Sequence, residues 1–402
     1  MKKVGKVFIL LIALASVGVG GFLLGSHSSQ IFALGGAGGS DADDQRIVEN
    51  IDLYRKTIAE DYLFDYTEQD LENGIYKGMF AGLNDPYSQY YTPEEYKRMM
   101  EDTSGEFAGV GLVVIAGEDD LITVVSAIAN TPASRAGIKT NDKIVEVDGV
   151  AYAGSDLNEA TQKMRGPENT KVKLTIQRQV DGKTDTLHIE LVRQLITVDS
   201  VVGKLLEPGL GYVQITSFDE NTAAEFKKEW EALEQQGAAR FVLDLRNNPG
   251  GLLTTSQEIA DMLLGEGKIV TTVDNKGKEE VLTSDASQYK EPMVVLANEG
   301  SASASEILLG ALRDQKRAVS VGEKTFGKGI VQRLYPIGPN GEEGGFKLTM
   351  AEYLTPNGEK IHQKGITPDI QVELPADAKG IGPDFLEQDT QLARAIQEVK
   401  TK

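Results

Sequence analysis

From about residue 197 the chain alternates segments of strand character with segments of helix character, and no other feature constrains its fold as strongly. The segments predicted as strands are residues 211–215, 241–245, 293–297 and 318–322. The segments predicted as helices are residues 223–235, 256–264 and 304–313. Such alternation is typical of an α/β layered module, in which helices pack on a sheet. We assign this module to residues 196–373, and we expect a tail at residues 374–402 with a last helix over residues 385–399.

The part of the chain before this module predicts two further regions. Residues 105–195 contain short β-rich segments separated by turn signals such as Asp148-Gly149, which indicates a small β module. In residues 45–104, apolar side chains recur near helical spacing, and Thr92-Pro93-Glu94-Glu95 has the pattern of a helix start. We therefore predict a multidomain α/β and α+β protein, with the β module inserted between an N-terminal helical region and the α/β core.

The N-terminus has the features of an export signal. Three lysines within the first six residues precede an apolar run at residues 7–25, which is long enough to cross a bilayer. The lysines favour a cytoplasmic N-terminus with the rest of the chain outside. A cleaved signal peptide would also export the body, but no clean small-x-small cleavage site follows the run, so we predict that residues 1–25 are a retained membrane anchor. Residues 26–44 then form a flexible linker, and the body lies in the extracytoplasmic part of a bacterial cell envelope.

The composition argues against several classes of site. The formal charge of −20 disfavours nucleic-acid binding, which needs a basic surface. The sequence has no cysteine, which excludes disulfides, thiolate metal sites and cysteine nucleophiles. His188 falls in a β-rich segment and His362 in a polar turn, so neither is a good candidate for the base of a serine–histidine–aspartate triad. We expect no metal ion and no other cofactor.

Residues 322–329 nearly match a phosphate-binding loop. They follow the pattern G-x-x-x-x-G-K as far as Lys328, but Gly329 stands where that pattern has the Ser or Thr that binds magnesium. We therefore do not expect nucleotide binding.

A serine and a lysine remain as candidates for chemistry. Ser303 lies between a predicted buried strand and a predicted helix. With Glu306 it could form a capping box, but a helix start also offers free backbone N–H groups to an oxyanion. Lys328 lies between two glycines after another predicted strand. Burial can lower the pKa of a lysine well below its reference value of about 10.4, and a neutral amine could then remove the Ser303 proton.

These segments resemble those of the carboxyl-terminal processing proteases, also called tail-specific proteases. The resemblance is carried by residues 82–88, 243–251, 301–306 and 326–332. It implies that Ser303 is the nucleophile, that Lys328 is the general base and that Gln332 orients the lysine. It also implies a catalytic core similar to the crotonase superfamily.

The same resemblance implies how the oxyanion is held. One donor would be the Ala304 N–H, and the other a glycine N–H of the turn at residues 249–251. Gly250 is the preferred donor, with Gly251 as the alternative. Asp244, Arg246 and Asn247 are expected to shape that turn rather than to take part in the chemistry.

The β module resembles a PDZ domain, which binds the C-terminal tails of proteins. The place of its carboxylate-binding loop is taken by Gly109, Val110, Gly111 and Leu112. Successive N–H groups in such a turn can hold a terminal carboxylate, and an extended tail then adds as a strand. The PDZ-like pattern continues downstream, with Asn141 where the family usually has glycine. Arg165 matches a family arginine that links the PDZ domain to the catalytic site.

The sequence therefore predicts a serine endopeptidase that recognises the free C-terminus of exported or membrane proteins and cuts near it. The alternative is a catalytically inactive PDZ scaffold, which would be expected to have lost Ser303, Lys328 or Gln332, and all three are present. A trypsin-like protease with a PDZ domain is disfavoured, because the PDZ module here precedes the catalytic one and no histidine base is available. Relatives can self-associate through terminal segments, so a homo-oligomer is a further expectation.

Overall fold

The computed structural model describes residues 41–117, 119–180 and 182–402, so the predicted anchor at residues 1–25 and most of the predicted linker lie outside the described residues. The described part starts with α1 (Asp41–Asp61), α2 (Glu68–Ala81), the short strand β1 (Gln89–Tyr91) and α3 (Pro93–Ser104). Thr92 caps α3, because its hydroxyl accepts from the Glu95 N–H while the Glu95 carboxylate accepts from the Thr92 N–H. None of the helices in the described residues combines the length and apolar character that a membrane span needs.

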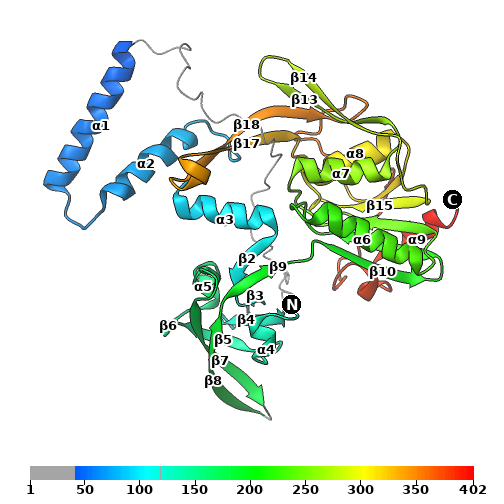
Figure 1. Ribbon diagram of the computed structural model, residues 1–402, viewed down its shortest axis with the longest axis horizontal. Helices are drawn as coiled ribbons and strands as arrows, with labels where there is room; N and C mark the ends of the chain where they lie inside the picture. Colours follow the sequence, from blue (N-terminus) through cyan, green and yellow to red (C-terminus); the bar gives the residue numbers. More distant parts are fainter. Residues whose placement is uncertain (1–40, 118, 181) are drawn as a thin grey trace, which may run out of the picture.

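Residues 106–197 form the β module, drawn in the lower part of Figure 1. Its main sheet is antiparallel and has the order β3 (Leu112–Ala116), β4 (Ile122–Ala127), β5 (Lys143–Val147), β7 (Lys171–Val180), β8 (Lys183–Val192). Smaller elements are β6 (Val150–Ala151), α4 (Pro132–Arg135), η1 (Gly154–Asp156) and α5 (Leu157–Met164). Buried side chains of the sheet and of both α-helices form one core. The pair β2 (Glu106–Gly109) and β9 (Gln194–Thr197) connects the module to the rest of the molecule.

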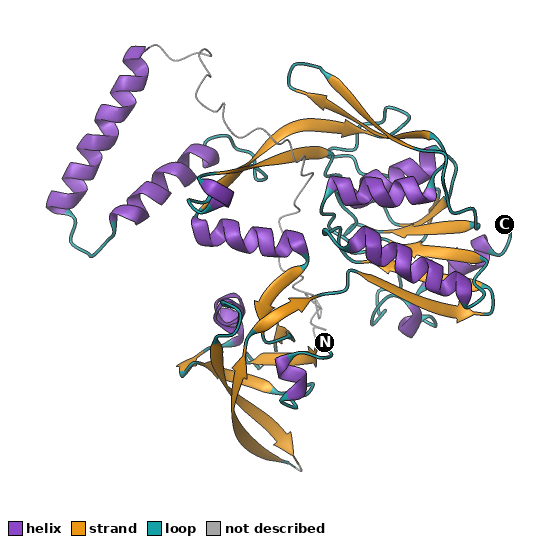
Figure 2. Ribbon diagram, viewed as in Figure 1, coloured by secondary structure: helices purple, strands orange, loops and turns teal. Residues whose placement is uncertain are grey.

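The predicted α/β layering is confirmed in the second half of the chain (Figure 2). The sheet has the order β10 (Val201–Glu207), β11 (Leu210–Ile215), β12 (Arg240–Asp244), β15 (Met293–Ala297), β16 (Val319–Gly322), β19 (Ile370–Gln371). All neighbouring pairs are parallel except β10 with β11. Alternate strand residues point to opposite faces. One face packs against α6 (Thr222–Gln235), α7 (Leu253–Leu263) and α8 (Ala304–Asp314), and the other against α9 (Thr390–Val399).

A second, antiparallel sheet was not predicted from the sequence, and it closes the top of the molecule in Figure 1. Its strands are β13 (Gly267–Asp274), β14 (Glu279–Ser284), β17 (Ile330–Pro336) and β18 (Gly345–Leu354), together with β1. The pairing of β1 with β18 joins the N-terminal region to the C-terminal half of the chain, because residues 89–91 lie opposite residues 345–347. Two short 3₁₀ helices, η2 (Pro339–Gly341) and η3 (Pro383–Phe385), complete the elements.

Candidate active site

Ser303 directly precedes α8, and its backbone has an unusual conformation. Its φ of 55° and ψ of −115° are unfavourable for a residue with a side chain. The Ser303 hydroxyl does not cap the helix. Only half of the expected capping box forms, since the Ser303 N–H donates to Glu306 Oε2 at 2.9 Å. A strained backbone therefore holds a serine hydroxyl at a helix start without using it as a cap, and strain of this kind gathers at active sites.

The Glu306 carboxylate brings the serine and lysine segments together. Its Oε2 accepts the N–H of Ser303 at 2.9 Å and the N–H of Lys328 at 2.8 Å. Its Oε1 accepts from the Gly327 N–H at 2.8 Å and from the Thr325 hydroxyl at 2.6 Å. Burial raises the pKa of Glu306, although these four hydrogen bonds favour its charged form. Because one oxygen binds both backbone amides, Ser303 and Lys328 are side by side although 25 positions separate them in the sequence.

Lys328 is buried, with 4% of its surface exposed. Burial lowers the pKa of its amine to about 8, and the negative charges of Glu306 and Asp85 oppose part of that shift. The Lys328 Nζ lies 4.8 Å from the centre of the Tyr87 ring. A lowered lysine pKa is the property that a lysine base requires near neutral pH.

Tyr353 on β18 provides a second connection between the two segments. Its hydroxyl donates to the Lys328 carbonyl oxygen. Burial raises the pKa of Tyr353, and a hydrogen bond with the Ser303 side chain opposes part of that increase. A single buried side chain thus contacts both Ser303 and the lysine backbone.

Gln332, the third residue of the predicted set, lies on β17 directly after a bulge in its pairing with β18. Its side chain is buried, and its Nε2 donates to the Ile330 carbonyl at 3.4 Å. Within the described residues its Oε1 accepts no hydrogen bond. The amide oxygen therefore keeps its capacity to accept a hydrogen bond from an amine.

The turn expected to hold the oxyanion lies against Ser303, but its two glycines differ. The Gly250 N–H donates to Asn248 Oδ1 at 2.8 Å, so it is already engaged. A Cβ atom on Gly250 would lie 2.8 Å from the Ser303 Cβ, so only glycine fits there. Gly251 lines a cavity of about 10 Å³ together with Ser303, Ala304 and Tyr353. Among the described residues, no acceptor is found for the N–H of Gly251 or of Ala304.

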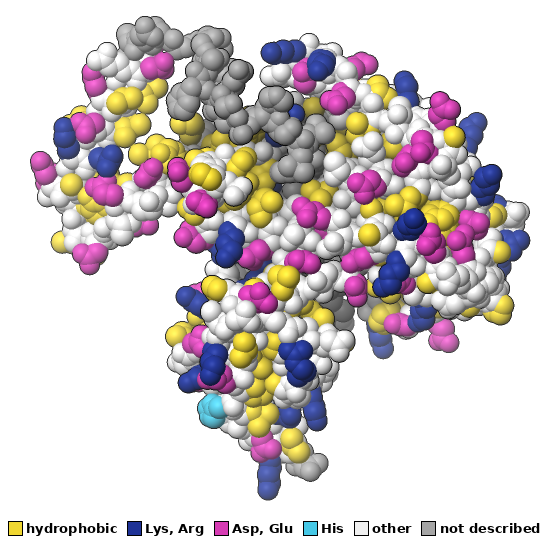
Figure 3. Space-filling view, viewed as in Figure 1, with side chains coloured by type: hydrophobic (Ala, Val, Ile, Leu, Met, Phe, Trp, Pro, Cys, Tyr) yellow, Lys and Arg dark blue, Asp and Glu magenta, His cyan; other side chains and the backbone are white. Residues whose placement is uncertain are grey.

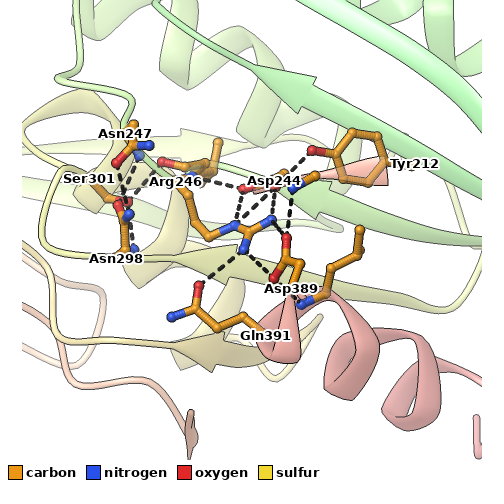
Figure 4. Close-up of polar contacts among 11 residues, drawn as sticks. Tyr212, Asp244, Arg246, Asn247, Asn298, Ser301, Asp389 and Gln391 are labelled. Atoms are coloured by element: carbon orange, nitrogen blue, oxygen red, sulfur yellow. Dashed lines mark hydrogen bonds and ion pairs between the residues drawn. The ribbon is translucent and has the colours of Figure 1, made fainter. Parts of the chain in front are cut away.

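A buried ion cluster fixes the start of this turn (Figure 4). The Arg246 guanidinium binds Asp244 at 2.6 Å and Asp389 at 2.8 Å, and its Nη1 also donates to Gln391 at 3.1 Å. The neighbouring Asn247 exchanges hydrogen bonds with Asn298 in the segment before Ser303. This arrangement agrees with a role for Asp244 and Arg246 in shaping the turn, and it adds two partners from the C-terminal tail.

The predicted carboxylate-binding loop lies between β2 and β3. Gly111 has a φ of 79°, and a Cβ atom there would lie within 2.5 Å of the Thr131 side chain, so only glycine is accommodated. The Gly111 carbonyl accepts from the Ile128 N–H, and the Val110 carbonyl from the Ala133 N–H. The N–H groups of Val110 and Gly111 donate to none of the described residues. The carbonyls are thus turned inward, and these two donors remain for a ligand.

Arg165 lies between this loop and the N-terminal helices. Its guanidinium carbon is 4.4 Å from the centre of the Phe107 ring, and its Nη1 is 3.2 Å from an oxygen of Asp102 on α3. Asp102 and Asp85 line the same cavity of about 640 Å³. The arginine therefore contacts both the β module and α3, and Asp102 of α3 lines this cavity together with Asp85, whose charge acts on Lys328.

The sequence did not single out Asp85, Lys347 or Tyr353 as members of the site. Tyr353 and Lys347 come from β18, and Asp85 precedes β1, which pairs with β18. The only sequence signal for Asp85 was its place in the segment 82–88. In the described residues, no group of three or more His, Asp or Glu side chains is arranged to hold a metal ion.

Comparisons with known proteins identify the family of this chain. The model of Peptidase family S41 matches residues 209–372, and that of a PDZ domain matches residues 123–178. The chain is 37% identical over 383 residues to the carboxy-terminal processing protease CtpA of Bacillus subtilis, covering 94% of this chain and 79% of that protein. It is 42% identical over 303 residues to a carboxyl-terminal-processing protease of Synechocystis, covering 74% of this chain and 70% of that protein.

A solved structure shows a similar fold. A crystal structure from Bacteroides fragilis, assigned to the S41 proteases, superposes with a TM-score of 0.53 at 14% identity. The match covers 85% of this chain and 91% of that one.

Proposed function

Because this chain belongs to the carboxyl-terminal processing proteases, serine-type peptidases of family S41 that carry a PDZ domain, we propose that it cuts proteins near a free C-terminus by a serine–lysine mechanism. The observation that carries the proposal is the Glu306 oxygen that binds the backbone amides of both Ser303 and Lys328. It fixes a hydroxyl at a strained helix start beside a buried lysine with a lowered pKa.

The chemistry follows from these positions. The neutral Lys328 amine removes the proton of the Ser303 hydroxyl, and the serine oxygen attacks the carbonyl carbon of the scissile bond. The Ala304 and Gly251 N–H groups stabilise the oxyanion, and Gln332 Oε1 accepts a hydrogen bond that orients the amine. The protonated lysine then gives its proton to the leaving amine. Water completes the cycle by hydrolysing the acyl-enzyme, again with Lys328 as base.

Gly251 takes the place that the sequence interpretation gave first to Gly250. The reason is the hydrogen bond from the Gly250 N–H to Asn248, which would have to break before that amide could serve an oxyanion. The crotonase-like character of the core remains part of this proposal.

The PDZ domain supplies substrate selection. The Val110 and Gly111 N–H groups would bind the terminal carboxylate of a tail, with Gly109 and Leu112 flanking them. Arg165 would transmit occupancy of this loop to α3 through Asp102. Replacing the terminal carboxylate of a peptide substrate by an amide should weaken cleavage several-fold, and equal rates for acid and amide would contradict this role.

Cleavage requires the site to open. Ser303 is 2% exposed, and the cavity beside it is about 10 Å³, close to the minimum for one water molecule. A peptide carbonyl cannot enter that space. We therefore regard this conformation as a resting form that opens when a tail binds.

The decisive test compares two lysines of one loop. Lys328→Ala should abolish peptide cleavage, whereas Lys324→Ala should leave it intact, because Lys324 is exposed. Ser303→Ala should also be inactive, and both inactive variants should still bind C-terminal peptides. Cleavage by the Lys328→Ala protein would exclude the lysine mechanism. An inactive wild-type protein that binds tails would instead support the PDZ scaffold.

We further propose that residues 1–25 anchor the protein at the outer side of the cytoplasmic membrane, on the basis of their apolar run and lysine flank. Membrane fractionation with and without residues 1–40 tests this.

Self-association is proposed for the N-terminal helices α1 and α2. Figure 3 shows apolar side chains along these helices, and the exposed ones on α1 are Ile47, Val48, Leu53 and Tyr54. Light scattering should give a larger mass for the wild-type protein than for a variant with Ile47 and Leu53 replaced by Ser.

A further inference from the structure

Residues 217–221, which we call the junction segment, lie between β11 and α6 and contact two parts of the molecule that the mechanism above treats separately. One side of the segment contacts the C-terminal end of α3, where the chain enters the PDZ domain. The other side pairs with the glycine turn beside Ser303. The segment therefore connects the place where the PDZ domain is attached with the turn that is proposed to hold the oxyanion.

Two hydrogen bonds join the junction segment to α3. The Glu220 N–H donates to the Thr103 carbonyl oxygen at 3.3 Å. The Asn221 side-chain amide donates to the Ser104 carbonyl oxygen, also at 3.3 Å. Carbonyl groups in the last turn of a helix lack intrahelical partners, so the junction segment provides donors that the end of α3 would otherwise have to find elsewhere.

Both connections between the PDZ domain and the rest of the chain meet at Gly105 (Figure 1). This residue lies between α3 and β2, and its carbonyl oxygen accepts at 3.2 Å from the N–H of Val198, which directly follows β9. A Cβ atom on Gly105 would lie 2.9 Å from Asp219 Cγ, and the Gly105 φ of 71° is unfavourable for a residue with a side chain. The Asp219 carboxyl group therefore packs against the backbone through which the PDZ domain is attached.

The same carboxyl group determines the shape of the junction segment. Asp219 is 6% exposed, and its Oδ1 accepts from the Asn221 N–H at 3.0 Å and from the Thr222 hydroxyl at 2.9 Å. Its Oδ2 accepts from the Ser217 hydroxyl at 3.3 Å. The Asp219 carbonyl oxygen accepts from the Thr255 hydroxyl of α7 at 3.0 Å. Because one buried side chain holds residues on both sides of it, the segment is expected to move as a unit.

Phe218, the neighbour of Asp219, holds the glycine turn. The Phe218 N–H donates to the Gly250 carbonyl oxygen at 3.0 Å, and the Phe218 carbonyl oxygen accepts from the Leu252 N–H at 2.6 Å. Gly251 lies between these two bonds and forms a bridge with Phe218. A Cβ atom on Gly251 would lie 2.1 Å from the Phe218 carbonyl oxygen, so only glycine fits there. The position of Phe218 therefore fixes the backbone that carries the Gly251 N–H.

We propose that Asp219 is a positioning residue that transmits the position of the PDZ domain to the Gly251 N–H of the oxyanion turn. This inference rests on the proposed function and deepens it, since it adds a route from tail binding to the chemistry. Arg165 contacts Asp102 in the last turns of α3, and the junction segment continues from the end of that helix to the turn. A PDZ domain that shifts when it binds a tail would then also align the oxyanion donor.

The test is cleavage by the full chain of one peptide with either a free or an amidated C-terminus, together with the affinity for a fluorescent tail. The acid-to-amide ratio of kcat/KM measures how far tail binding promotes the chemistry. Asp219→Ala should bring this ratio close to one by slowing cleavage of the acid peptide, with tail affinity unchanged. Asp219→Asn retains an acceptor oxygen for Asn221 and Thr222 and should keep most of the wild-type ratio. Asp199→Ala removes an exposed carboxylate directly after Val198 and should leave the ratio unchanged.

A purely structural role for Asp219 would lower the melting temperature and slow cleavage of both peptides by the same factor. That outcome, or an unchanged ratio in a folded Asp219→Ala protein, would overturn the proposal. Should that variant fail to fold, Asn221→Ala decides, because it removes only the side-chain bond to Ser104. A lower ratio in Asn221→Ala supports the coupling, and an unchanged ratio contradicts it. Equal rates for the two peptides in the wild-type protein would instead refute tail recognition itself, and the coupling with it.

Discussion

Two buried cations of the catalytic half have similar exposure and opposite surroundings. Arg246 and Lys347 are each 1% exposed. The guanidinium of Arg246 is enclosed by Asp244, Asp389 and Gln391, and these carboxylates raise the pKa of Arg246 in spite of its burial. Lys347 has no acceptor within the described residues, and burial lowers its pKa to about 8.

This contrast teaches that burial alone does not decide what a charged side chain does. A buried cation with a full set of hydrogen-bond acceptors stays charged and holds the segments that contact it together. An amine with too few acceptors is poised to release its proton near neutral pH, which is the property expected where proton transfer occurs. The first cation fixes the start of the turn at residues 247–251, and the second lies on β18, whose Tyr353 hydroxyl donates to the Lys328 carbonyl oxygen.

The largest effect should come from breaking the Arg246 cluster. Asp389→Ala removes one carboxylate of the cluster and the cap of α9, where Asp389 accepts from the Leu392 N–H at 2.9 Å. The free energy of unfolding should fall by about 3–5 kcal/mol, because a buried ion pair is left incomplete. Urea denaturation measures this, with Lys347→Met as the comparator. A decrease in the free energy of unfolding smaller than about 1 kcal/mol would mean that the cluster does not stabilise the fold.

An intermediate effect is expected in the pH dependence of the wild-type enzyme. In the proposed mechanism only the unprotonated Lys328 amine acts as base, and burial lowers the pKa of that amine to about 8. Below that value kcat/KM should therefore rise about tenfold per pH unit and then level off. A rate that is flat between about pH 5 and about pH 9 would contradict a lysine base.

The smallest effect should be a pH-dependent difference in stability between wild type and Lys347→Met. The folded pKa of Lys347 is about 8, below the unfolded reference of about 10.4, so the unfolded chain binds more protons between these values. Wild-type stability should therefore rise relative to the variant as pH increases from about 8 to about 10, by about 1–2 kcal/mol. Parallel curves for the two proteins would show that Lys347 has an ordinary pKa.

The sequence predicted those parts of the site that lie in continuous segments. Ser303, Lys328 and Gln332 stand in two short motifs, and the alternating pattern around them predicted the sheet that carries them. Glu306 was recognised only as a potential helix cap, because its bonds to the lysine loop depend on tertiary structure.

The other residues of the site and of the Arg246 cluster could not be predicted, because segments far apart in the sequence bring them together. Lys347 and Tyr353 belong to an antiparallel sheet whose strands lack a helix-like or alternating signature strong enough to be identified. Asp389 reaches Arg246 from 143 positions along the chain. The choice between Gly250 and Gly251 depends on the direction of a single N–H group, which no composition or spacing reveals.

The cavity of about 10 Å³ at Ser303 has a consequence for how such an enzyme coexists with folded neighbours. Under the proposed mechanism, the Ser303 hydroxyl is inaccessible in the resting form, and proteins that lack a suitable C-terminal tail are not cut. Part of the free energy of tail binding is spent on rearranging the residues that line this cavity. The measured affinity of the protein for a tail should therefore be weaker than the intrinsic affinity of the open form. Covalent serine-directed probes should accordingly label this protein slowly on their own and faster in the presence of a docked peptide.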